Sequence, residues 1–100
     1  MRDNKFRLLW SGEAENDLME IWSSGTTRWS EEKADEHVLE IQQSVARLLH
    51  NPMLGRPRDE VMVGVRSMIV TPHIVFYQIS NSTIEIVRVL HQKIDVERVF

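Results

Sequence analysis

Residues 65–91 constrain the fold most strongly, because they contain three apolar runs separated by two short turn sequences. The first run, 65–70, ends at a Thr-Pro pair, and proline lacks an N–H donor and disfavours helical geometry in the residue before it. The second run, 73–79, ends at a Ser-Asn-Ser sequence of turn-forming residues. The third run is 83–90, and β-branched residues are frequent in all three. This pattern predicts a three-stranded antiparallel meander.

The first half of the chain predicts one strand and two helices. Residues 5–10 alternate between polar and apolar side chains, as in a half-buried strand. Ser11 and Ser30 are each followed by acidic residues, which is typical of a helix N-cap and first turn. The first helix is expected to weaken at residues 23–27, five poor helix formers in succession. The second helix carries an apolar stripe at helical spacing, formed by Ala34, Val38, Ile41, Val45 and Leu48.

The order of these elements predicts an α+β fold. Two helices joined by about two residues are expected to pack as an antiparallel hairpin, with Trp22 and Trp29 buried against the second helix or the sheet. Residues 53–60 contain proline, glycine and mixed charge, so they are predicted to form a loop. We therefore expect one domain, residues 1–100: an antiparallel β-meander with the N-terminal strand at an edge and the helical hairpin packed on one face.

The middle strand of the meander has apolar side chains on both faces. Its period of two places Ile74 and Phe76 on one face and Val75, Tyr77 and Ile79 on the other. Helices from the same chain can cover one of these faces. The other face needs a different cover, or it remains an exposed apolar patch of the kind that marks a partner site.

Composition and charge exclude several classes of protein. The net charge of -3 argues against general affinity for nucleic acid, although residues 1–51 hold six Lys and Arg against ten Asp and Glu, and residues 52–100 hold six against five. Cysteine is absent, which excludes a disulfide framework and thiolate-bound zinc. No segment approaches the roughly 20 apolar residues that span a bilayer, and the N-terminus lacks a signal-peptide pattern. A cytoplasmic protein that does not contact membranes is the expectation.

Most cofactor and catalytic motifs are missing. His37, His50, His73 and His91 lie in separate predicted elements without metal-ligand spacing, so no metal is expected, and residues 35–37 are interpreted as a solvated helix face. The dispersed glycines do not form a nucleotide-binding loop, and no serine sits in a nucleophile elbow. Carboxylates four residues apart on the helices are interpreted as an acidic surface. We expect no cofactor.

The remaining candidates for chemistry are basic and aromatic residues of the meander. They are Arg66, Arg88, His91 and Lys93, with His73 and Tyr77. A metal-free ribonuclease needs a general base, a general acid and cations beside the phosphate, and this set contains those groups. On a flat strand, however, Arg88 and His91 point to opposite faces, unless the strand ends or bends first. The alternative interpretation is that Arg88 pairs with an acid such as Glu85 or Asp59 and that His91 caps the sheet edge.

Short motifs from about residue 6 to residue 95 carry a family resemblance. They are Ser11…Ala14-Glu15…Asp17-Leu18…Ile21-Trp22, Trp29-Ser30…Ala34-Asp35, residues 51–56, Gly64-Val65-Arg66, residues 73–77 and residues 87–91. In this order and spacing they resemble the ParE toxins of the RelE/ParE toxin superfamily. The resemblance implies a small bacterial toxin that poisons DNA gyrase. It also implies a ParD-like antitoxin that wraps a disordered C-terminal segment around the toxin.

RelE-like relatives on the same fold cleave mRNA in the ribosome, so the fold does not decide between the two activities. Those nucleases typically have an arginine early in the second meander strand, where this chain has Ile74. They also use a C-terminal tyrosine or basic residue, where this chain offers Gln92, Ile94 or Phe100. His91 does match a catalytic histidine of some relatives. The resemblance therefore favours a non-enzymatic gyrase inhibitor, and the alternative is a ribosome-dependent mRNA endonuclease that uses His91.

Two sets of site residues follow from this interpretation. Gyrase contacts are expected among the basic residues of the second half, Arg66, Arg88, His91, Lys93 and Arg98. Antitoxin contacts are expected on the hairpin and the middle strand, at Trp22, Trp29, Val75, Tyr77 and Ile79. The inhibitor needs no catalytic residue, whereas the alternative nuclease would use His91 with Arg88 and Arg66. Sequence-specific DNA binding by this chain itself is not expected.

Overall fold

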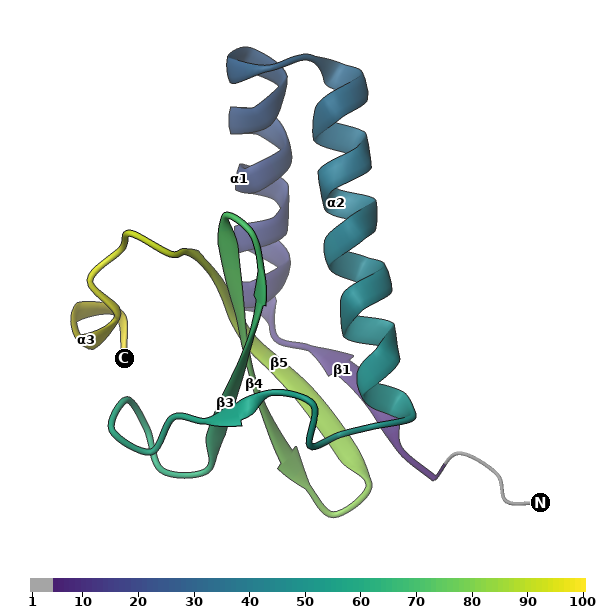
Figure 1. Ribbon diagram of the computed structural model, residues 1–100, viewed down its shortest axis with the longest axis vertical. Helices are drawn as coiled ribbons and strands as arrows, with labels where there is room; N and C mark the ends of the chain where they lie inside the picture. The colour runs from purple at the N-terminus through teal and green to yellow at the C-terminus, as the bar shows by residue number, and fades with distance from the viewer. Residues whose placement is uncertain (1–4) are drawn as a thin grey trace.

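The computed structural model describes residues 5–100. Two long helices stand side by side on a sheet and extend beyond it at the end where they are connected (Figure 1). The predicted α+β architecture, a meander with a helical hairpin on one face, is confirmed. The elements in chain order are β1 (Arg7–Trp10), α1 (Gly12–Arg28), α2 (Glu31–Ala46), the 3₁₀ turn η1 (Arg47–Leu49), β2 (Arg56–Pro57), β3 (Val65–Val70), β4 (His73–Ser80), β5 (Thr83–His91) and α3 (Val96–Val99).

The five strands form one mixed sheet in the order β1-β5-β4-β3-β2. The N-terminal strand β1 lies at an edge, as predicted, and it runs parallel to β5, while the other neighbours are antiparallel. The opposite edge is β2, whose two residues pair with Ser67 and Arg66 of β3. The prediction of a loop throughout residues 53–60 is therefore wrong at β2, which is too short to give a periodic signal.

Strand β5 is interrupted by a β-bulge. Phe76 pairs with Arg88 but its neighbour Tyr77 pairs with Ile86, so Val87 has no partner across the ladder. An extra residue of this kind bends a strand and turns the side chains that follow it. The bulge lies just before Arg88, and residues 88–91 pair in regular register with residues 73–76.

Both long helices begin at the predicted serines. The Ser11 hydroxyl accepts a hydrogen bond from the Ala14 N–H at 3.0 Å and donates one to the Val87 carbonyl at 2.9 Å, so it also ties the start of α1 to β5. The Ser30 hydroxyl accepts from the Lys33 N–H at 3.1 Å. Each cap satisfies one of the N–H groups that a helix start leaves without an intrahelical partner.

The predicted weakening of α1 at residues 23–27 is wrong, because the helix continues to Arg28. Gly25 is buried where the two helices meet. A Cβ at this position would lie 3.1 Å from the Ala34 Cβ and 3.2 Å from the Trp29 ring. The glycine therefore permits close packing of α1 on α2, and that tertiary contact outweighs its low helix propensity, which is worth about 1 kcal/mol.

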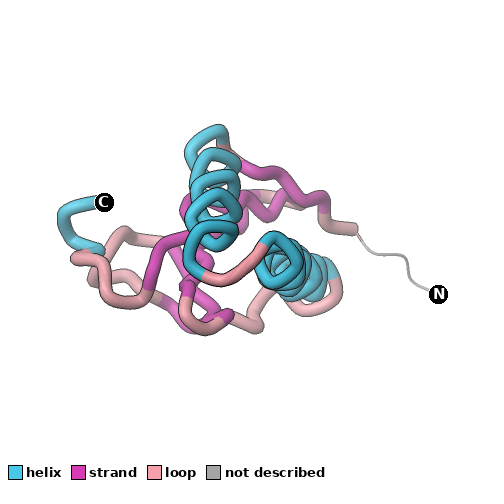
Figure 2. Tube along the Cα trace, turned by 90° about the horizontal axis from the view of Figure 1, so that it is seen from above, coloured by secondary structure: helices cyan, strands magenta, loops and turns pink. Residues whose placement is uncertain are grey.

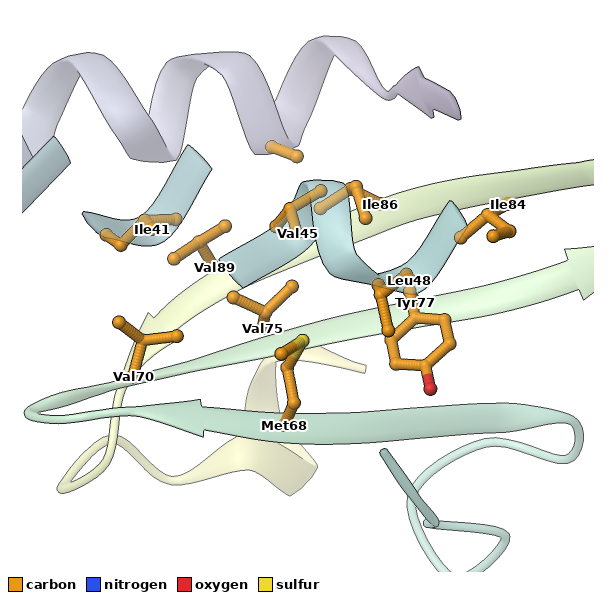
Figure 3. Close-up of a cluster of buried hydrophobic side chains, with 11 residues drawn as sticks. Ile41, Val45, Leu48, Met68, Val70, Val75, Tyr77, Ile84, Ile86 and Val89 are labelled. Carbon is orange, nitrogen blue, oxygen red and sulfur yellow. The ribbon is translucent and has the colours of Figure 1, made fainter. Parts of the chain in front are cut away.

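The main hydrophobic core fills the space between the hairpin and the sheet (Figure 3). It contains Ala14, Ile41, Val45, Leu48, Met68, Val70, Val75, Tyr77, Ile84, Ile86 and Val89. Four of the five residues in the predicted α2 stripe are fully or almost fully buried, and Val38 is half-buried. Burial of this apolar surface is the main force that holds the hairpin on the sheet.

A second, smaller cluster covers the opposite face of the sheet. Val65, Phe76 and Leu90 are buried there beneath α3 and the C-terminus, which lie apart from the hairpin (Figures 1 and 2). The rings of Phe76 and Phe100 have centroids 5.1 Å apart. The Arg58 guanidinium lies 5.5 Å from the Phe76 ring centroid, in cation–π contact. The two-faced character of β4 is thus confirmed, and the chain's own tail covers its second face.

Within residues 5–100, no helix is both long enough and apolar enough to cross a membrane.

Candidate functional site

Arg88 and His91 line the same cavity, which we call the β5 cavity. It has a volume of about 410 Å³ and lies between α1, the β3–β4 turn and the end of β5. Its polar lining residues include Asp17, Glu20, Arg28, His73, Arg88 and His91. Strand β5 ends at His91, and the cavity spans this end of the strand, so both predicted residues line it. For the two residues to serve one site, the sequence required that the strand end or bend.

Arg88 is held by a carboxylate from α1. Its Nε and Nη2 donate to the two carboxylate oxygens of Asp17, both at 2.8 Å, and the Val89 N–H donates to the same carboxylate at 2.9 Å. The hydrogen bond to Asp17 raises the pKa of Arg88. The predicted partners Glu85 and Asp59 are wrong, since Glu85 accepts from Gln78 and Asp59 accepts from the Gly64 N–H. The positive charge of Arg88 is therefore already neutralised within the protein.

Three histidines from α2, β4 and β5 meet beside this cavity. His37 Nε2 and His73 Nδ1 form a buried hydrogen bond of 2.8 Å, and His73 lies directly opposite His91, with ring centroids 5.4 Å apart. The edge of Trp29 packs against His37. The interpretation of residues 35–37 as a solvated face is wrong for His37, whose exposed fraction is only 8%. Among residues 5–100, no cluster of three or more His, Cys, Asp or Glu side chains is arranged to hold a metal ion.

The buried histidine pair makes stability depend on pH. Burial, followed by the nearby charges of His37 and His91, lowers the pKa of His73 from 6.5 to about 4. The folded state resists protonation of His73, so the protein is most stable at a pH where this histidine is neutral in both the folded and the unfolded state. This contribution is complete above pH 6.5 and is lost as the pH falls towards 4, at a cost of about 2 kcal/mol.

This pH dependence is measurable by urea denaturation at pH 7 and at pH 4.5. Carboxylates also titrate in this range, so the informative quantity is the difference between variants. His73→Leu is expected to lose less stability on acidification than the wild type, whereas His50→Leu, at an exposed histidine, is expected to behave as the wild type does. Equal pH dependence in wild type and His73→Leu would contradict the role of His73.

The other predicted target contacts lie outside the β5 cavity. Arg66 Nε donates to the Gly55 carbonyl at 2.7 Å and Nη2 to the Met53 carbonyl at 3.5 Å, so this side chain anchors the loop before β2. Lys93 follows the end of β5, where its N–H donates to His91 Nδ1 at 3.1 Å. Arg98 lies on α3 with an exposed side chain 3.7 Å from Asp95. Of the five basic positions, only Arg88 and His91 line the β5 cavity.

The predicted antitoxin contacts divide into exposed and buried residues. Trp22 and Trp29 are 39% and 49% exposed, so the prediction that they are buried is wrong. Val75 and Tyr77 are fully buried beneath the helices, and Ile79 is partly buried against the same core. The prediction that Val75 and Tyr77 face a partner is therefore corrected: the hairpin covers that face of β4. The two tryptophans remain accessible.

Comparison with known families is decisive for the class of protein. The model of the ParE toxin of the type II toxin-antitoxin system parDE matches residues 8–96. The chain belongs to the ParE toxin family. It is 39% identical over 93 residues to Toxin ParE1 of Mycobacterium tuberculosis, covering 92% of this chain and 95% of that protein. It is 33% identical over 85 residues to Toxin ParE1 of Caulobacter vibrioides, covering 85% and 88% respectively.

Solved structures share the ParE fold described above. The chromosomal ParDE toxin-antitoxin system from P. aeruginosa superposes with a TM-score of 0.79 at 24% identity, covering 89% of this chain and 98% of that chain. The RelBE2 toxin-antitoxin complex from Mycobacterium tuberculosis gives 0.67 at 18% identity, covering 87% and 98%. At these identities the likeness concerns the fold. This ParE-family chain therefore has the architecture common to the ParE and RelE branches.

Sequence reasoning missed two residues that organise the site of this ParE-family toxin. The sequence places Asp17 in a family motif and on an acidic helix but does not identify its partner, Arg88, which lies 71 positions away. His37 was assigned to solvent, although it bonds to His73 from 36 positions away. One local signal was available for Asp17. Ala14, three residues before it, and Ile21, four residues after it, lie on the same side of the helix and face the interior, so the Asp17 side chain is expected to point the same way.

Proposed function

We propose that this ParE-family toxin inhibits DNA gyrase by binding, without cleaving RNA, and that a ParD-like antitoxin neutralises it. The observation that carries this proposal is the state of the two candidate catalytic arginines. Arg88 is neutralised by Asp17, and Arg66 is bound to backbone carbonyls of the loop. A ribonuclease needs cations free to stabilise the developing charge on phosphate. Without a free arginine to stabilise the charge on phosphate, His91 would be a weak catalyst of RNA cleavage.

The proposed gyrase contacts are the exposed basic residues of the C-terminal segment. Lys93 and Arg98 are exposed and belong to the tail that packs over the second apolar cluster. Both residues belong to the predicted contact set, and this proposal favours them over Arg66 and Arg88, whose guanidinium groups have structural partners. His91 contributes through its place at the end of β5, next to Lys93.

Supercoiling of relaxed plasmid by purified gyrase, with and without the toxin, tests this proposal. The wild type is expected to inhibit the reaction. Lys93→Glu combined with Arg98→Glu is expected to raise the toxin concentration for half-inhibition by about tenfold or more, because charge reversal at a contact opposes association. Lys33→Glu, at an exposed position of α2, is the matched control and is expected to inhibit as the wild type does. No inhibition by excess wild type would refute the proposal.

The alternative activity is tested in parallel on programmed ribosomes. Under the proposal, neither the wild type nor His91→Ala cleaves mRNA above background. Cleavage by the wild type that disappears in His91→Ala would overturn the binding mechanism in favour of the endonuclease.

A further inference from the structure

Two imidazole groups of the β5 cavity have a ring nitrogen that the fold does not use. His73 and His91 lie directly opposite each other on β4 and β5, and both line the cavity. His73 Nδ1 is hydrogen-bonded to His37 Nε2 at 2.8 Å, and His91 Nδ1 accepts from the Lys93 N–H at 3.1 Å. Among residues 5–100, neither His73 Nε2 nor His91 Nε2 has a hydrogen-bond partner. Both atoms are therefore available to a ligand.

The tautomer of His91 follows from its contact with the backbone. A backbone N–H can only donate, so the Lys93 N–H requires a lone pair on His91 Nδ1. Neutral imidazole carries one ring proton, which must then lie on Nε2. His91 thus offers an N–H donor to the cavity. The same tautomer prevents His91 Nε2 from ligating a metal ion, because a metal needs the lone pair that the proton occupies.

The tautomer of His73 is set from helix α2. The Glu40 carboxylate lies 3.4 Å from His37 Nδ1, and a carboxylate only accepts, so neutral His37 carries its proton on Nδ1. His37 Nε2 then has a lone pair, and His73 Nδ1 donates to it. His73 Nε2 is left with a lone pair of its own. Burial lowers the pKa of His73 to about 4, so this atom remains an acceptor at neutral pH.

The rest of the cavity suits an uncharged ligand with an apolar body. Its charged lining consists of two acids and two bases, Asp17, Glu20, Arg28 and Arg88. These charges balance, so the lining favours neither an anion nor a cation. The volume of about 410 Å³ lies within the range of small-molecule sites, roughly 300–1,000 Å³. The apolar lining is formed by Ile21, Trp29, Pro72, Val89, Leu90 and Ile94.

We propose that the β5 cavity binds a small aromatic carboxamide, whose carbonyl oxygen accepts from the His91 Nε2–H and whose amide N–H donates to His73 Nε2. The aromatic ring of the ligand packs on the apolar lining. A carboxylate lacks the N–H that His73 requires, and an amine lacks the carbonyl that His91 requires. The carboxamide satisfies both histidines without bringing a charge into the cavity. This site is separate from the proposed gyrase contacts on the exposed tail.

The two tautomers are measured directly by the ¹⁵N chemical shifts of the imidazole rings in the full-length protein at about pH 7.5, where the histidines are neutral. His73 is expected to carry its proton on Nδ1 and His91 on Nε2. His50, an exposed histidine outside the cavity, is the control and is expected to exchange between both tautomers. A proton on His73 Nε2 would overturn the proposed acceptor.

The ligand chemistry is tested by titrating the ¹⁵N-labelled toxin with benzamide and three analogues. Benzamide is expected to shift the backbone amides around the cavity and to bind about tenfold or more tightly than N,N-dimethylbenzamide and benzoate, which lack the N–H. Benzyl alcohol, with donor and acceptor on one atom, is expected to bind as weakly as these two. No saturable shift with benzamide, or equal affinity for all four compounds, would overturn the proposal.

An amide group can also come from a glutamine or asparagine side chain of another protein. Propionamide, which has the glutamine side-chain amide without an aromatic ring, distinguishes this source. It is expected to bind about tenfold or more weakly than benzamide, because it buries less apolar surface against the lining. Equal affinity of propionamide and benzamide would overturn the assignment to an aromatic small molecule. None of these titrations contains gyrase, so they stand apart from the test of the proposed function.

Matched variants test the two histidines and their support. His91→Phe removes the donor and is expected to weaken benzamide binding by about fivefold or more, whereas His50→Phe is expected to leave it unchanged. Glu40→Ala removes an acceptor whose side chain is 62% exposed, so the fold is expected to persist. Because Glu40 acts through His37, this variant is expected to weaken benzamide binding and to move proton density onto His73 Nε2. Glu36→Ala, at an exposed position of the same helix, is its control. Unchanged benzamide affinity in both His91→Phe and Glu40→Ala would overturn the site.

Discussion

Replacing Asp17 with alanine is expected to lower the free energy of unfolding by about 3 kcal/mol. The side chains of Arg88 and Asp17 are only 24% and 11% exposed, so the substitution leaves a guanidinium in a largely buried position without its counter-charge. The Val89 N–H loses its acceptor as well. A broken pair of this kind costs far more than an exposed salt bridge, which contributes about 0–1 kcal/mol.

Chemical denaturation of purified variants measures this effect. Asn16→Ala, at the exposed neighbouring position of α1, is the control and is expected to change stability by no more than about 0.5 kcal/mol. Adding Arg88→Met to Asp17→Ala removes the unpaired charge, so the double variant is expected to recover part of the loss. Similar losses in Asp17→Ala and Asn16→Ala would show that the ion pair contributes little.

The Asp17–Arg88 pair also connects stability to function. The same carboxylate that stabilises the packing of α1 on β5 also neutralises Arg88, which lines the β5 cavity together with His91. A nuclease would require that cation to be available to the substrate. The structural role of Asp17 therefore supports the proposal that toxicity depends on binding.

The features predicted correctly from the sequence depend on neighbours within a few residues. Helix caps at Ser11 and Ser30 and the three meander strands follow from local hydrogen bonding, turn residues and β-branched side chains. The division of β4 into two apolar faces follows from the strand period alone. These signals predict the fold because the main core is built mostly from the α2 stripe and one face of the sheet, with Ala14 of α1.

The features predicted wrongly depend on contacts between distant segments. The sequence identifies Arg88 and His37 as polar residues but contains no local signal for their partners, because Asp17 and His73 approach them only after the hairpin packs on the sheet. The cover over Phe76 comes from α3, a helix of four residues that is too short to show periodicity. The error for Val75 and Tyr77 has the same origin: the pattern gave two faces but not which one the hairpin covers.

Gly55→Ala is expected to destabilise the protein by about 3 kcal/mol, because the loop before β2 packs against Tyr77 with no room for a side chain. A Cβ at residue 55 would lie 2.6 Å from the Ser67 carbonyl oxygen and 2.7 Å from the Tyr77 ring. The Tyr77 hydroxyl donates to the Pro52 carbonyl at 2.7 Å and accepts from the Gly55 N–H at 2.8 Å. Moving the loop away to relieve the clash would break both bonds in a buried position.

Thermal and urea denaturation of Gly55→Ala and Gly12→Ala distinguish this clash from a general effect of replacing glycine. Gly12 has open space around its Cβ position and lies in the first turn of α1, so alanine there is expected to leave stability unchanged or raise it by about 0.5 kcal/mol. Tyr77→Phe removes the hydroxyl and is expected to cost about 2 kcal/mol on its own. Because both substitutions break the same hydrogen bond, the double variant is expected to lose less than the sum of the two single losses. Additive losses would show that Gly55 and Tyr77 act independently and that the loop is not held by their contact.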